Sequence, residues 1–168
     1  MKVLPITIFL FLITGCTKLV DAIERNDTTE VLAVVEKMNK SLTHHDLEEL
    51  LTCYAQELDW ENSFGWSIRD KEKLGAYFGE WLFARYPKMN PKQLKLDVKA
   101  DRLNSELAWA EVVQYIYTEQ LDSIVRTYRQ THLLIQEDDR WKIQKTRMWA
   151  PTKYQNAPDE FITSRSIF

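Results

Sequence analysis

Residues 59–65 read Asp59-Trp60-Glu61-Asn62-Ser63-Phe64-Gly65, and the local period of the chain changes around them. From Leu58 to Asn62, residues that can face a core alternate with the acidic Asp59 and Glu61. An alternation of period two is typical of a half-buried strand. The following Ser63-Phe64-Gly65 is typical of a turn. This stretch therefore predicts a strand that ends in a tight turn.

Two helices are predicted before this strand. Asp27-Thr28-Thr29-Glu30 has the residue types of a capping box at a helix N-terminus. Apolar residues then recur at helical spacing as far as Leu42, which predicts one apolar face. A second, short helix is predicted to begin near Asp46 and to place Tyr54 on its apolar side.

A third helix and several strands are predicted after the turn. Asp70 has the residue type of a helix cap, and the apolar face that follows runs from Leu74 to Leu82. Gly75 and Gly79 lie four apart in this helix and predict close packing against a neighbour. Strands are predicted at about residues 94–98, 106–118, 123–136 and 141–150. Helices followed by a run of strands indicate an α+β fold.

Composition excludes several function classes. The chain has 168 residues, four of them glycines, and a formal net charge of −3. One compact domain fits this length. A nucleotide-binding loop needs glycines clustered after a strand, and the sequence has no such cluster. Since the sequence also lacks a Lys/Arg-rich stripe, we expect no nucleic-acid partner, and we expect no cofactor.

The N-terminal residues have the pattern of a signal peptide. Lys2 precedes an apolar run that is too short to span a bilayer. The run ends in Ile13-Thr14-Gly15-Cys16, which resembles the cleavage site of bacterial lipoproteins, whose Cys is acylated with fatty acids. The resemblance implies a protein anchored through Cys16 on the extracytoplasmic side of a membrane of the bacterial cell envelope. An ordinary secretory signal with a chance Cys, or an uncleaved anchor, stays open as the alternative.

These features divide the chain into four parts. The predicted parts are a signal peptide at 1–15, the lipidated Cys and a tether at 16–27, one domain at 28–150, and a C-terminal tail at 151–168.

Three segments of the predicted domain resemble a known family. They are His45-Asp46-Leu47 at the second helix, residues 59–65 quoted above, and Asp139-Arg140-Trp141-Lys142-Ile143 at the last strand. Together with the order of elements they resemble the SnoaL-like branch (SgcJ/EcaC type) of the NTF2-like superfamily. The resemblance implies a cone: two to three N-terminal helices packed in a strongly curved antiparallel sheet. It also implies an apolar pocket and, in many members, a homodimer.

The ketosteroid-isomerase branch of that superfamily has a catalytic pattern that this chain does not reproduce. Laid on the chain from Gly65 without gaps, the pattern places the general-base Asp at Asn62, the Tyr at Met38 and the second Asp at Thr131. An amide does not take up a proton near neutral pH, and a thioether donates no hydrogen bond. These departures argue against steroid-isomerase chemistry.

The same register and strand parity predict which side chains line a pocket. The predicted lining is Trp60, Asn62, Tyr77, Trp81, Arg129, Thr131 and Met148. His132 alternates with Thr131 and is therefore predicted to face away from the pocket. Glu111 is a candidate acid–base residue, but the residues do not decide which face of 106–118 is inward, because a slip of one residue exchanges it for Ala110. Adjacent histidines such as His44-His45 point apart, and we expect no metal site.

Three functional hypotheses follow. The first is a membrane-anchored pocket protein that binds a small, largely apolar molecule in the cell envelope. The second is a cofactor-independent acid–base enzyme (a lyase, isomerase or hydrolase) that uses Glu111. The third is a dimeric interaction module of the envelope. The residues alone leave open whether the chain is an enzyme.

Overall fold

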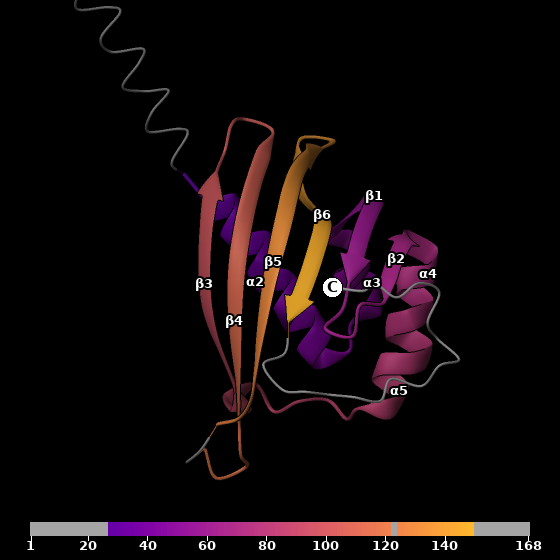
Figure 1. Cartoon of the computed structure of the whole chain (residues 1–168), viewed down its shortest axis with the longest axis vertical. Helices are drawn as coiled ribbons and strands as arrows, with labels where there is room; N and C mark the ends of the chain where they lie inside the picture. The colour runs from indigo at the N-terminus through magenta and orange to yellow at the C-terminus, as the bar shows by residue number, and fades with distance from the viewer. Residues whose placement is uncertain (1–26, 122–123, 150–168) are drawn as a thin grey trace, which may run out of the picture.

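The computed structural model describes residues 27–121 and 124–149 as helices packed against one sheet (Figure 1). The helical elements are α2 (Thr29–His44), α3 (Leu47–Thr52), α4 (Lys71–Ala76), the π-helical turn η1 (Tyr77–Leu82), α5 (Phe83–Arg85) and the 3-10 turn η2 (Pro91–Gln93). The strands are β1 (Tyr54–Glu61), β2 (Ser67–Asp70), β3 (Leu94–Arg102), β4 (Leu107–Tyr117), β5 (Ile124–Glu137) and β6 (Arg140–Trp149).

The six strands form one sheet in the order β2-β1-β6-β5-β4-β3. Four of the five neighbouring pairs in the described chain are antiparallel. The prediction of an antiparallel sheet needs one correction, since β1 pairs with β6 in parallel, with Trp60 beside Thr146. This pairing joins the strand after the short helices to the last strand of the meander, and it makes the sheet mixed. The α+β class with helices packed against a curved sheet is confirmed.

The core lies between α2 and one face of the sheet, which we call the inner face. Helix α2 contributes Val31, Val35 and Met38, all buried. Small side chains on β4, such as Ala108 and Ala110, lie under the helix and are fully buried. Figure 1 shows α2 running behind strands β4 to β6, with no described element in front of them.

Local capping explains where the short helices begin. The Asp46 carboxylate accepts from Glu49 N at 3.0 Å, and the Asp70 carboxylate accepts from Lys73 N at 2.8 Å. Each cap satisfies an amide that has no partner inside its helix. Both helix starts were predicted. Tyr54 was predicted in the second helix, but α3 ends at Thr52 and Tyr54 opens β1, because its buried side chain packs in the sheet core instead.

Cys16 and the predicted parts 1–15 and 151–168 lie outside the described residues, as does most of 16–27. No helix in the described part of the chain is long and apolar enough to cross a membrane.

Candidate functional site

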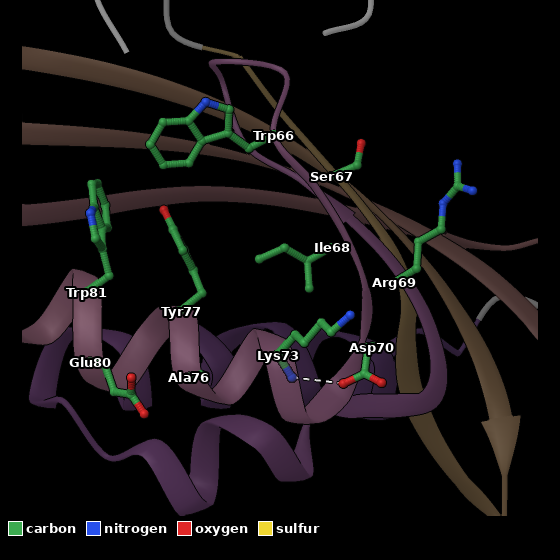
Figure 2. Close-up of a pocket in the computed structure, with 10 residues that line it drawn as sticks. All are labelled: Trp66, Ser67, Ile68, Arg69, Asp70, Lys73, Ala76, Tyr77, Glu80 and Trp81. Atoms are coloured by element: carbon green, nitrogen blue, oxygen red, sulfur yellow. Dashed lines mark hydrogen bonds between the residues drawn. The ribbon is translucent and has the colours of Figure 1, made fainter. Parts of the chain in front are cut away.

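A groove of about 820 Å³ lies between strand β2 and the helix formed by α4 and η1 (Figure 2). The strand side consists of consecutive residues, Trp66, Ser67, Ile68, Arg69 and Asp70. The helix side consists of Lys73, Ala76, Tyr77, Glu80 and Trp81. The helix residues follow the spacing of one helical stripe, so a single face of the helix forms one wall.

The position of this helix depends on two glycines on its other side. A Cβ atom built on Gly75 would lie 3.0 Å from a methyl carbon of Leu51, and one on Gly79 would lie 3.0 Å from a methyl carbon of Leu47. The glycines therefore let the helix approach α3 closely, as predicted, and the aromatic stripe is left facing β2.

One end of the groove is aromatic. The rings of Tyr77 and Trp81 stack with centroids 5.3 Å apart and an interplanar angle of 17°. Trp66 stands edge-on to Trp81, with centroids 5.4 Å apart. In Figure 2 these three side chains extend together from β2 and the helix, away from Arg69 and Lys73. Tyr77 and Trp81 are partly exposed and offer flat apolar surface to a ligand, as small-molecule sites do, whereas Trp66 is 5% exposed and supports them.

The phenol of Tyr77 stays protonated at any physiological pH. Burial raises the pKa of Tyr77 to about 12, and the amide of Asn62 lowers that pKa by a smaller amount. A neutral phenol at the groove wall can donate or accept one hydrogen bond.

Asn62 is buried and shapes the turn that carries Trp66. Its carboxamide oxygen accepts from Phe64 N at 2.9 Å and from Trp66 N at 3.0 Å. Gly65 in the same turn has a φ of +78°, which a residue without a Cβ adopts without strain. The carboxamide oxygen therefore holds the β1–β2 turn in place and does not point into the groove as a ligand contact.

Trp60 lies beneath the groove, not in it. Its side chain is 3% exposed, and its ring lies 5.0 Å from Tyr77 and 5.6 Å from Phe78, centroid to centroid. The predicted inward direction of Trp60 and Asn62 agrees with the structure. Of the seven predicted lining residues, Tyr77 and Trp81 contribute to the groove wall.

The predicted faces of Arg129 and Thr131 are wrong. Thr131 pairs with Glu111 and Arg147, and Arg129 is paired with Trp149, on the outer face of the sheet. The inner positions of β5 are taken by Gln130 and His132, both buried. The family pattern was aligned to this chain without gaps, so the prediction did not include the register shifts in β4–β5 and β5–β6. A displacement of one residue moves every side chain of a strand to the opposite face.

Met148 lies on the inner face but outside the groove. It pairs with the buried Gln130 on β5, so it shares a face with the core. Its contribution to a ligand site stays a prediction.

Glu111 lies on the outer face, away from the groove. Its neighbours along β4, Ala110 and Val112, are fully buried on the inner face, whereas the Glu111 side chain is 37% exposed. A carboxylate oxygen lies 3.9 Å from the guanidinium of Arg129, which is 65% exposed. The structure thus separates the predicted acid–base residue from Tyr77 and Trp81.

Polar side chains that sequence reasoning did not select gather inside the core. The ring nitrogen Nδ1 of His132 lies 3.0 Å from Thr146 Oγ1, and Gln114 Nε2 donates to Asn39 Oδ1. His132 was predicted to face away from the pocket, on the side opposite Thr131; it lies on the inner face of the sheet, is 1% exposed and does not line the groove. Burial lowers the pKa of His132 to about 4.

The groove itself also contains residues that the sequence did not mark. Trp66 and Ile68 alternate with Ser67 and Arg69, but β2 has only four residues. An alternation this short is difficult to distinguish from a loop. Within the described ranges, no three His, Cys, Asp or Glu side chains gather as metal ligands would.

Comparison with known proteins identifies the fold. No family model matches the chain, and no curated protein matches it. An NTF-2-like protein of unknown function from Shewanella oneidensis is 18% identical, with a TM-score of 0.56 over 73% of this chain and 98% of its own. A ketosteroid isomerase-like protein from Erwinia carotovora atroseptica is 9% identical, with a TM-score of 0.62 over 76% of this chain and 98% of its own.

A third similar structure comes from Pseudomonas putida. This NTF2-like protein of unknown function is 16% identical, with a TM-score of 0.60 over 76% of this chain and 88% of its own. Identities this low carry the fold and no activity. The chain therefore has the NTF2-like fold, with a few helices packed against a curved, mixed sheet of six strands.

Proposed function

We propose that this chain is a lipid-anchored protein of the bacterial cell envelope that binds a small, largely apolar molecule. The ligand site is the groove between β2 and the α4–η1 helix. The observation that carries this proposal is the aromatic end of the groove, where Trp66, Tyr77 and Trp81 form an apolar wall.

The physical basis is burial of apolar ligand surface on a preformed wall. Each Å² of apolar surface removed from water contributes about 25 cal/mol. The stacked pair of Tyr77 and Trp81 needs little rearrangement, so little binding energy is lost in ordering side chains. The phenol of Tyr77 adds one polar contact that orients the ligand.

Ala76 offers a direct test, because it is an exposed helical residue that lines the groove. The Ala76→Phe variant places a ring in the ligand's space, and we expect its affinity for an apolar fluorescent naphthylamine probe to fall at least about tenfold. The measurement is a fluorescence titration of the full chain in detergent micelles.

Ala84→Phe is the matched control for this titration. Ala84 is exposed on the same helical segment, in α5, and does not line the groove. Its substitution should leave probe affinity unchanged. Equal affinity of Ala76→Phe and the unsubstituted chain would place the ligand elsewhere and contradict the proposed site.

Anchoring through Cys16 has a separate test. Growth with a labelled fatty acid should label the wild-type chain and not the Cys16→Ser variant, since the thiol is the acylation site. Labelling to the same extent in both chains would remove the lipoprotein assignment, and it would leave the groove proposal untouched.

The acid–base enzyme is supported less well than the binding protein. Glu111 lies on the outer face beside Arg129, so a ligand stacked on Tyr77 has no contact with its carboxylate. The homodimer stays a prediction. Its most suitable surface is the outer face of β4, where Trp109, Val113 and Tyr115 are only partly buried.

A further inference from the structure

Lys73 brings a positive charge into the groove from the helical side. In Figure 2 its side chain extends from α4 toward β2, at the end of the groove where Asp70 lies. The Asp70 carboxylate accepts from the backbone amide of Lys73 at 2.8 Å. In the described part of the chain, no carboxylate forms an ion pair with the Lys73 ammonium. This exposed ammonium is therefore available to an acidic ligand.

Arg69 adds positive charge at the same end of the groove. Its side chain is 78% exposed and, in Figure 2, extends from β2 away from the helix. The neighbouring Asp59 carboxylate lies 3.7 Å from Arg69, but it also lies 3.6 Å from the Lys145 ammonium and binds Arg147. Arg147 in turn lies 3.5 Å from a second acid, Glu61. Three cations thus share two acids, and the excess positive charge favours an anion at this end.

The aromatic end of the groove is lined by an acid instead. Glu80 is exposed and lies seven residues after Lys73, almost two helical turns away. The Arg85 guanidinium is also at that end, but it lies 4.9 Å from the Trp81 ring centroid and does not line the groove. An anionic ligand is therefore oriented with its charge toward Lys73.

Apolar side chains connect the two ends. In Figure 2 Ile68 extends from β2 toward the helix, and the helix contributes Ala76. Lys73 and Tyr77 are four residues apart, so their Cα atoms are separated by about 6 Å along the helix axis. A body of two fused rings with one acidic substituent has the length to lie against Tyr77 and to reach the ammonium on its flexible stem.

We propose that the ligand of the groove is a small carboxylic acid, whose flat apolar body lies against Tyr77 and Trp81 and whose carboxylate binds the Lys73 ammonium. This inference rests on the proposed function, since it names the chemical class of ligand for the same groove.

The charge contributes selectivity more than affinity. An ion pair between exposed groups gains little over the hydration that it replaces, which amounts to about fivefold in a binding constant. Contact with the aromatic rings supplies most of the affinity, and the ammonium distinguishes ligands of the same shape. Preference for an acid over a neutral molecule of equal shape is therefore the property to measure.

A matched pair of probes isolates the acidic group. Naphthoate and naphthamide, substituted at the same ring position, have the same two fused rings, but only naphthoate is ionised at neutral pH. Equilibrium dialysis of the full chain in nonionic detergent micelles, against micelles without protein, gives both affinities. The full chain should bind naphthoate about fivefold more tightly than naphthamide.

Variants at Lys73 show whether its ammonium causes this preference. Lys73→Gln keeps an exposed helical side chain without the charge, so it should bind both probes equally and naphthamide as well as the unsubstituted chain does. Lys73→Glu should bind naphthamide more tightly than naphthoate. Lys99→Gln is the matched control, because Lys99 is exposed on β3, at the opposite edge of the sheet from β2. It removes the same charge and should keep the full preference.

Equal affinities of the two probes for the full chain, or a preference for naphthoate that persists in Lys73→Gln, would overturn the inference. If both probes bind equally and Ala76→Phe weakens both, the proposed function stands and the inference alone fails. If neither probe binds, or if Ala76→Phe leaves both affinities unchanged, the proposed function fails and the inference fails with it.

Discussion

Replacing Trp60 with alanine is expected to lower the free energy of unfolding by about 3–5 kcal/mol. The ring is 3% exposed and packs against Tyr77 and Phe78, so its removal leaves a cavity under the groove wall. Both the lost transfer energy of the ring and the unfilled volume contribute to the cost. Urea unfolding followed by circular dichroism, at low protein concentration, measures the change.

Trp149→Ala is the matched control for Trp60→Ala. Trp149 is 53% exposed at the end of β6, and surface substitutions of this kind usually change stability by about 0.5 kcal/mol or less. If Trp60→Ala lost probe binding but less than about 1 kcal/mol of stability, the ring would be a ligand contact, and its assignment to the core would be wrong.

Stability is expected to fall on acidification through His132. Burial lowers the pKa of His132 to about 4, from the ordinary histidine value of 6.5. Between these two values the unfolded chain binds a proton at this site and the folded chain does not. The free energy of unfolding therefore decreases as the pH falls. The contribution of His132 is fully present above pH 6.5 and is lost toward pH 4, where the loss reaches about 3 kcal/mol.

Urea unfolding at a series of pH values from about 7.5 to about 4, on both sides of the ordinary His pKa of roughly 6.5, isolates this contribution. The glutamine side chain of His132→Gln does not titrate, so the free energy of unfolding of this variant should depend less on pH. His44→Gln is the control, since His44 lies at the exposed end of α2, where its ring hydrogen-bonds to Lys40 O. Unchanged pH dependence in His132→Gln would show that the ring takes up a proton inside the folded protein. Titration of the carboxylates contributes equally to the pH dependence of the free energy of unfolding in both variants, so it cancels when the two are compared.

Features determined by neighbouring residues could be predicted from the sequence. Asp46 and Asp70 begin helices because their carboxylates reach amides three residues ahead, a contact that needs no tertiary partner. The parity of β1 was also predictable, since acids at Asp59 and Glu61 alternate with apolar residues and cannot enter a core unpaired. The predicted close packing at Gly75 and Gly79 follows from the same local reasoning about space.

Features determined by distant partners could not be predicted. Strand β5 carries polar residues on both faces near Arg129 to His132, so its own pattern does not mark the buried side. That side is set by pairing with β4 and β6, including the shift between Leu133 and Leu134. The edge position of β2 likewise depends on β1 pairing with the last strand, which lies more than eighty residues further along the chain.

By itself, the sequence determined the α+β order of elements, the starts of α3 and α4, the turn after Asn62 and the inward face of β1. Tertiary structure alone decided that Arg129, Thr131 and Glu111 lie on the outer face, that His132 is buried, and that the groove follows β2. The physical reason is one of range. Caps, turns and alternation act over a few residues, whereas the absolute face of a strand is chosen by its register with partners far away in the chain.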